Sequence, residues 1–122
     1  MLPVQHRLRT GVEFSAVTRG PGGARAGSRL IVVHAKQTDS RAVRPPRVGL
    51  VVSKSVGGAV TRNLVKRRLR ACVAGLIGTV PAGVDIVVRA QSAASDVPYA
   101  DLAADLERLV GVVVERVSAR AL

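Results

Sequence analysis

The side chains whose chemistry is most evident in this sequence lie at residues 62–70, in the run RNLVKRRLR. On a helix, which turns about 100° per residue, an arc of about 140° gathers five polar side chains: Arg62, Asn63, Lys66, Arg67 and Arg70. Like charges four residues apart repel by roughly 0.2–0.5 kcal/mol per pair, and a merely solvated face normally interleaves acidic residues. No Asp or Glu occurs between Ser40 and Val84. The pattern therefore predicts a face that binds a polyanion, driven by the release of counterions.

The residues that could form a hydrolytic active site or hold a metal show no comparable pattern. His6 and His34 have no acidic neighbour in the sequence, and such histidines are more often surface or hydrogen-bonded core residues. Asp96, Asp101 and Asp105 suggest a carboxylate set for magnesium, but Asp101 and Asp105, four residues apart on a helix, more often solvate an outer face. Cys72 is the single cysteine, which favours a buried thiol over a disulfide or a metal ligand. We therefore expect no catalytic residue and no metal site on this chain.

The residues around the basic run predict the elements that position it. The β-branched run Val48–Val52 is typical of a strand, and Gly57 and Gly58 predict a turn. From about Ala59 a helix would bury a stripe beside the basic face, formed by Val65, Leu69, Cys72 and Leu76. The amides of the turn fit an RNA phosphate site and a plain turn equally well, because the run lacks the Gly-Lys-Ser/Thr of a nucleotide-binding loop.

Toward the N-terminus, the sequence predicts a helix and a strand. A helix begins at Thr10, which can form a capping box with Glu13, and it ends before the glycine-rich stretch 20–23. Leu30–Ala35 predicts a strand with Leu30, Val32 and His34 on one side. The polar connection 37–46 that follows is expected to be exposed.

Toward the C-terminus, Val84–Ala90 predicts another strand, and a final helix runs from Val97 to about Val117. Asp96 could cap that helix, whose buried stripe would be Leu102, Leu106, Leu109, Val113 and Val117. This order of elements predicts an α+β domain in which helices pack against one sheet.

Composition limits the classes of function. The chain has 122 residues, which suits one domain, and 19 Lys and Arg against 8 Asp and Glu give a net charge of +11 and a pI near 11.7. Such a charge favours a nucleic acid or an anionic membrane as partner over the substrate of a metabolic enzyme. No apolar run reaches the roughly 18 residues of a membrane span, and the N-terminus lacks a signal sequence. We expect a cytoplasmic protein.

The run VGLVVSKSVGGAVTRNLVKRRLR resembles the signature of the bacterial ribonuclease P protein subunit. Its features are a VSK strand end, a G-x-A-V turn and an R-N-x-x-K-R-x-x-R helix. The R-L-R-x-x-x-E-F pattern at Arg7–Phe14 and the run DIVVRA at 85–90 extend the likeness over most of the chain. The resemblance implies a single RNA-binding domain over residues 1–122, with a basic N-terminal extension at about 1–9. It also implies about four strands and three helices in a fold similar to the second domain of ribosomal protein S5, with a left-handed βαβ crossover.

The resemblance further implies a role in removing the 5′ leader of precursor tRNA. The catalytic RNA subunit would cleave the phosphodiester bond with Mg²⁺ that is bound mainly by RNA, and this chain would bind no metal, no membrane and no protein partner. The contact with the RNA subunit falls on Lys54, Arg62, Asn63, Lys66, Arg67 and Arg70. The contact with the leader, between the first helix and the sheet, falls on Phe14, Val17 and Arg19.

Three positions depart from the family pattern. Leu64 and Ser55 stand where basic residues are common, and Thr18 stands where a second aromatic residue is common. Two alternatives to this function remain: a ribosomal or other structural RNA-binding protein, and a domain that binds anionic membranes. The apolar stripe beside the basic face lacks the Trp or Phe anchors that membrane binding favours.

Overall fold

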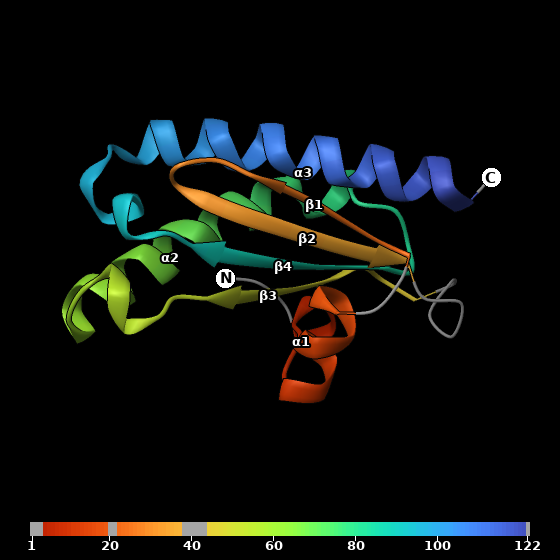
Figure 1. The fold of residues 1–122 in the computed structure, drawn as a ribbon, viewed down its shortest axis with the longest axis horizontal. Coiled ribbons are helices and arrows are strands. Elements are labelled where there is room, and N and C mark those ends of the chain that lie inside the picture. Colours follow the sequence, from red (N-terminus) through yellow and green to blue (C-terminus); the bar gives the residue numbers. More distant parts are fainter. Residues whose placement is uncertain (1–3, 20–21, 38–43, 122) are drawn as a thin grey trace.

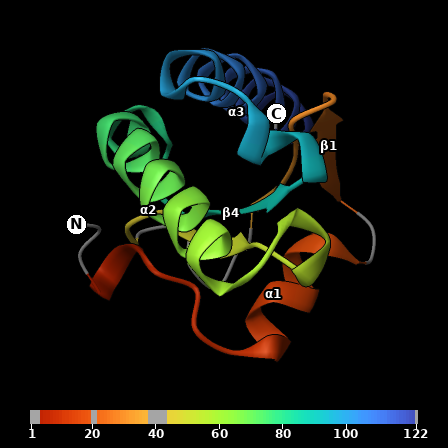
Figure 2. The same ribbon diagram turned by 90° about the vertical axis from the view of Figure 1, so that its left-hand side faces the viewer.

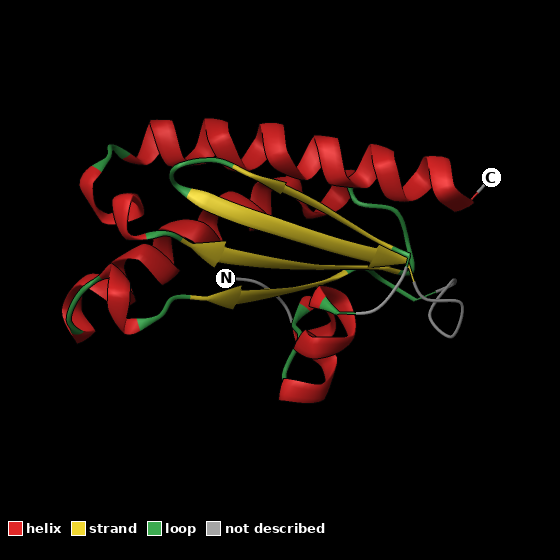
Figure 3. Ribbon diagram, in the orientation of Figure 1, coloured by secondary structure: helices red, strands yellow, loops and turns green. Residues whose placement is uncertain are grey.

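The computed structural model describes residues 4–19, 22–37 and 44–121, and within these ranges the chain forms three α-helices and one four-stranded sheet (Figures 1 and 3). The helices are α1 (Gly11–Thr18), α2 (Ala59–Leu76) and α3 (Tyr99–Ala121). The strands are β1 (Gly23–Gly27), β2 (Ile31–Gln37), β3 (Arg47–Val51) and β4 (Val84–Ala90). Short 3-10 helices lie at Val4–His6, Lys54–Val56, Ile77–Thr79 and Ser92–Asp96. The predicted α+β class is confirmed.

The sheet has the strand order β1-β2-β4-β3, in which β3 and β4 are parallel and the other two pairs are antiparallel. The connection between the parallel strands is α2. It lies behind the sheet in Figure 1 and to the left of it in Figure 2, while β4 lies above β3 in both views. This arrangement is a left-handed crossover, as the family resemblance implied.

The two faces of the sheet differ because successive side chains of a strand point to opposite sides. One face carries Ile31, Val33, Ile86 and Val88, which are buried beneath α2 and α3. The stripe predicted for the last helix is confirmed, since Leu102, Leu106, Leu109, Val113 and Val117 are all buried. On α2, Val65, Leu69 and Cys72 are buried as predicted, whereas Leu76 is only half-buried and Val73 is buried beside it.

The other face of the sheet is covered in part by α1. A small second core holds Leu8, Val17 and Val87, with Phe14 and Val51 packed against it. The capping box predicted for α1 is present: the Glu13 amide donates to Thr10 Oγ1 (3.1 Å), and the Thr10 amide donates to Glu13 Oε1 (3.0 Å). A well-defined start to α1 thus fixes where Phe14 and Val17 meet the sheet.

Several predictions at the element ends were wrong or incomplete. The strand β1, with sequence GARAG, was missed because its glycines and alanines have low strand propensity. Leu30, predicted to begin the strand, precedes β2, and its side chain packs in the main core. Its amide donates to Ser28 Oγ (3.0 Å), and its carbonyl accepts from the Gln91 amide (2.8 Å). Within the predicted N-terminal extension, the structure has a 3-10 turn and a buried Leu8.

Two further differences concern the connection 37–46 and the start of α3. Residues 38–43 lie outside the described ranges, while Gln37 belongs to β2 and Pro46 is buried. The last helix begins at Tyr99 rather than Val97, and Asp96 ends a separate 3-10 helix. No helix in the described part of the chain is long and apolar enough to cross a membrane.

Candidate RNA interface

The basic face predicted for α2 is present on the side of the helix that points away from the core. Asn63, Arg67 and Arg70 are exposed, and Arg62 and Lys66 are half-buried. None of the five side chains makes an ion pair or a side-chain hydrogen bond within the described ranges. The Nε of Arg62 is buried without a hydrogen-bond partner, and an unpaired buried donor costs free energy. An anion that reorganises this side chain would relieve that cost.

Lys54 lies in the connection between β3 and α2, close to the end of β3. It begins the 3-10 helix that follows β3, and its side chain is exposed. Nearby, the hydroxyls of Ser53 and Ser55 are hydrogen-bonded to each other (2.8 Å). Leu64 is 38% exposed on the outer surface of α2, so this departure from the family pattern leaves an apolar group beside the basic face.

A charge network that sequence analysis missed holds α1 against the sheet. The Arg47 guanidinium donates to Asp85 from Nε (3.1 Å) and Nη2 (2.9 Å), and Nη1 pairs with Glu13. Glu13 also accepts from the Arg9 amide (2.8 Å) and caps α1. The side chain of Asp85 is 3% exposed, so this carboxylate needs the guanidinium beside it.

The pKa values of this network follow from its geometry. The hydrogen bonds from the backbone amides of Arg9 and Thr10 are the largest cause that lowers the pKa of Glu13, and the Arg47 charge adds to it. The carboxylate of Asp85 is the main cause that raises the pKa of Arg47. Both shifts favour the charged forms of Glu13 and Arg47 at neutral pH, and the network joins α1 to β3 and β4.

The position of Phe14 depends on a glycine in the strand beneath it. A Cβ atom added to Gly49 would lie 2.3 Å from Phe14 Cε2 and 2.4 Å from Cζ, so the ring lies directly over the β3 backbone. Phe14 is half-buried, and it therefore both fills the second core and presents part of its surface to solvent. Val17, which the family resemblance placed at the leader contact, is 4% exposed and belongs to the second core, against which Phe14 packs.

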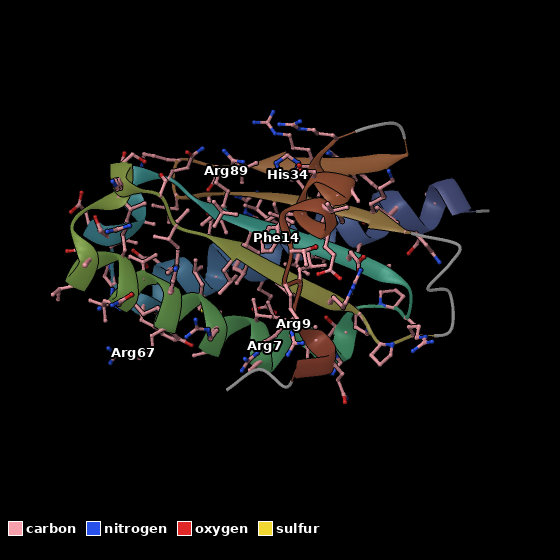
Figure 4. All side chains as sticks on the ribbon, turned by 90° about the horizontal axis from the view of Figure 1, so that it is seen from below. Arg7, Arg9, Phe14, His34, Arg67 and Arg89 are labelled. Carbon is pink, nitrogen blue, oxygen red and sulfur yellow. The ribbon has the colours of Figure 1, made fainter. Side chains whose placement is uncertain are left out.

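Two cavities carry cationic side chains close to α1, one at the free edge of β3 beside α2 and one on the sheet face that α1 partly covers. One, which we call the Lys66 cavity, is lined by the cationic side chains of Arg7, Lys66 and Arg70 and by Leu8, Phe14, Val48, Gly49 and Leu50. The other, which we call the His34 cavity, is lined by Thr18, Arg19, Arg25, Val32, His34, Arg89 and Gln91. In the view of Figure 4, Phe14 lies between Arg7 and Arg9 on one side and His34 and Arg89 on the other.

The His34 cavity gathers positive charge from three parts of the chain. Arg25 of β1 stands opposite His34 of β2, Arg89 belongs to β4, and Arg19 follows α1. Burial, followed by the charges of Arg25 and Arg89, lowers the pKa of His34. Strand alternation in β2 and β4 could have found His34 and Arg89, but Arg25 lies in the strand that the sequence did not reveal.

The structure thus relates the predicted site residues to one another as follows. Phe14 shares a cavity with Lys66 and Arg70, and Arg19 lies in the other cavity. Lys54, Arg62, Asn63 and Arg67 line neither of these two cavities and extend the basic surface along the β3–α2 connection. A small basic α+β domain with an unpaired cationic face on α2, within the described ranges, beside a partly open sheet face has the features that are typical of nucleic-acid-binding proteins.

Comparison with known proteins identifies the family. A sequence model described as Ribonuclease P matches residues 2–114. The ribonuclease P protein component of Kocuria rhizophila is 47% identical over 116 residues, which cover 95% of this chain and 98% of that protein. The structure of the Staphylococcus aureus RNase P protein aligns with a TM-score of 0.76 and 25% identity, and it covers 88% of this chain and 94% of that one. The Thermotoga maritima RNase P protein aligns with a TM-score of 0.69 and 25% identity over 89% and 96% of the two chains.

The chain therefore belongs to the bacterial ribonuclease P protein family, whose members are components of an endoribonuclease that processes tRNA. This result favours the leading prediction from sequence over a ribosomal protein or a membrane-binding domain.

Proposed function

We propose that this protein binds the catalytic RNA subunit of ribonuclease P through α2 and binds the 5′ leader of precursor tRNA beside α1. The observation that carries the proposal is the face of α2, where four basic side chains and Asn63 lack partners within the described ranges. Phosphates would supply the missing partners, and the release of their counterions would drive binding. Lys54 extends this contact to the end of β3.

The leader contact rests on Phe14, Arg19 and the His34 cavity. A half-buried aromatic ring offers a stacking surface to an unpaired base, whatever its identity. Arg19, Arg25 and Arg89 offer charge to the phosphates of the same strand. Val17 acts in this proposal by holding the ring in place rather than by touching RNA.

The chemical step is assigned to the RNA subunit, with Mg²⁺ held mainly by RNA. Three carboxylates of this chain, Glu13, Asp85 and Asp105, are already bound by other side chains. Asp85 and Glu13 hold Arg47, and Asp105 is bound by Ser28 Oγ and by Arg108 (2.8 Å). Within the described ranges, no three His, Cys, Asp or Glu side chains gather as metal ligands would.

The deciding assay is cleavage of precursor tRNA by the cognate catalytic RNA at low Mg²⁺, with and without the protein. We expect strong stimulation by the wild-type chain. A Lys66→Gln/Arg67→Gln variant should stimulate less at equal concentration, because it removes two phosphate contacts. The matched control is Arg108→Gln/Arg116→Gln, which removes the same charge from α3. Equal behaviour of the two variants, or no stimulation by the wild type, would show that α2 does not bind the catalytic RNA.

A further inference from the structure

The Lys66 cavity lies where the N-terminal segment, β3 and α2 meet, and it has a volume of about 170 Å³. Its inner wall is apolar, formed by Leu8, Val48 and Leu50 together with the Phe14 ring. Its cationic groups are Arg7, Lys66 and Arg70, and no acidic side chain of the described residues lines it. The cavity thus combines an apolar slot with positive charge, which excludes a cationic or purely apolar occupant.

Backbone contacts hold the walls of this cavity in place. β3 is an edge strand of the sheet, and the N-terminal segment covers part of its free edge through a bridge between Arg7 and Val48. The Leu8 amide donates to the Val48 carbonyl (3.0 Å). The cavity is therefore formed before any ligand arrives, which lowers the entropic cost of binding.

The opposite wall comes from the basic face of α2. Lys66 and Arg70 lie one helical turn apart on the same side of the helix, so both charges face the cavity. Neither side chain has a hydrogen bond or an ion pair within the described ranges. Two adjacent, unpaired cations are suited to bind the oxygens of one phosphate group.

The size of the cavity limits the occupant. Sites for drug-sized ligands measure roughly 300–1,000 Å³, so a cavity of about 170 Å³ accepts one ring system and not a stretch of oligonucleotide. Proteins commonly bind unpaired RNA bases by packing them against aromatic and apolar side chains, with cations on the backbone phosphates.

We propose that the Lys66 cavity binds a single unpaired nucleotide of the catalytic RNA, with its base against Leu8, Phe14 and Leu50 and its phosphate between Lys66 and Arg70. The choice of the catalytic RNA rests on the proposed function, because Lys66 and Arg70 belong to the face of α2 assigned to that partner. The single-nucleotide site follows from the cavity itself. Phe14 lines this cavity and Arg19 lines the His34 cavity, so the site for the catalytic RNA lies beside the proposed leader contact.

The first test is a titration of the full chain, with labelled methyl groups, followed by NMR. The probes are the four nucleoside 5′-monophosphates, ribose 5-phosphate and inorganic phosphate, each at millimolar concentration. We expect the nucleotides to shift the methyl signals of Leu8, Val48 and Leu50, and ribose 5-phosphate and inorganic phosphate to leave them unchanged. Methyl shifts that inorganic phosphate reproduces, or their absence with every nucleotide, would overturn the single-nucleotide site.

Matched variants test the role of the cations. Lys66→Gln should weaken nucleotide binding roughly tenfold or more, because it removes a charged partner of the phosphate. Arg67→Gln removes the same charge from the neighbouring position, which does not line the cavity, and should leave the nucleotide shifts unchanged. Arg70→Gln is the second variant, should Lys66→Gln fail to fold. Equal weakening by Arg67→Gln and Lys66→Gln would show that general charge, and not the cavity, binds the nucleotide.

A competition experiment identifies the RNA that supplies the nucleotide. The catalytic RNA alone should displace a bound mononucleotide from the cavity, and a single-stranded leader oligonucleotide should not. Displacement by the leader alone would overturn the assignment to the catalytic RNA. The proposed function is judged separately, because stimulation of precursor-tRNA cleavage by the wild-type chain does not depend on these shifts.

Discussion

Replacing Gly49 by alanine is the most direct test of how the fold positions Phe14. The new Cβ would lie 2.3 Å from the Phe14 ring, whereas ordinary contacts begin at 3.4 Å, so the ring has to move by about 1 Å. The ring cannot move inward, because Leu8 Cβ also lies 3.1 Å from the new atom and the second core is filled. Overpacking of this kind costs about 1–3 kcal/mol, and we expect that loss for Gly49→Ala.

A double-mutant cycle isolates the clash. Phe14→Ala alone should cost roughly 2–4 kcal/mol, toward the lower end of the range for core phenylalanines because the ring is only half-buried. In that background Gly49→Ala should cost close to nothing, because the space above the strand is empty. Gly27→Ala is the matched control in β1: its Cβ would lie 3.4 Å from Val32 Cγ2, an ordinary contact, so stability should change by about 0.5 kcal/mol or less.

Stability is measured by denaturant unfolding of the free protein, and function by the affinity of the assembled holoenzyme for precursor and mature tRNA. A ring displaced from the strand should stack poorly on a leader base. Gly49→Ala should therefore weaken precursor binding roughly tenfold while mature tRNA, which lacks the leader, is nearly unaffected. Additive stability costs in the cycle would refute the placement of the Phe14 ring over Gly49. Equal losses for both tRNAs would refute its placement at the leader contact.

The remaining predictions concern α2 and the charge network. Arg67→Ala should leave stability within about 0.5 kcal/mol and weaken RNA binding, while Leu69→Ala should cost roughly 2–5 kcal/mol; the reverse would show a wrong helix phase. Each charge removed from the basic face should reduce the slope of log affinity against log salt by about one, and a slope unchanged by these removals would exclude this face as the phosphate contact. Arg47→Met should lower the free energy of unfolding, measured in melts, by roughly 2–4 kcal/mol, because it deprives a buried carboxylate of its partner. The side chain of Arg108 is 60% exposed, so Arg108→Met should lower it by at most about 1 kcal/mol. Similar losses for the two variants would contradict a structural role for the network. Folding lowers the pKa of Glu13 below 4.5, so the stability that its carboxylate contributes is present above that pH and is lost as the pH falls through the pKa of the folded state. Glu13→Gln should therefore make the melting temperature depend less on pH in acid. A pH profile unchanged by this substitution would contradict the role of Glu13.

Local patterns predicted the elements that carry the interface. The phase of α2 followed from the spacing of Val65, Leu69 and Cys72, because a helix repeats every 3.6 residues wherever it lies. The capping box of α1 followed from Thr10 and Glu13 for the same reason, since its hydrogen bonds span three residues. Information of this kind is contained in a short window of sequence.

The features that sequence reasoning missed depend on residues far apart in the chain. Arg47 meets Glu13 and Asp85 across separations of 34 and 38 residues, and nothing local marks it as different from other arginines. Gly49 looked like an ordinary residue of a strand, because its role depends on a ring that arrives from α1. Both cavities likewise require the sheet order, which local patterns do not determine.

The left-handed crossover is explained by the different side chains on the two faces of the sheet. For a given order of β3 and β4, the hand of the connection decides which face of the sheet α2 covers. One face presents Ile86 and Val88, which must be buried, and the other presents Arg89 with His34 of the neighbouring strand. A right-handed connection would place α2 over the charged face and leave the apolar one to α3 alone. The left-handed connection buries the apolar face beneath two helices and leaves the cationic face, with Phe14 upon it, uncovered by α2 and α3.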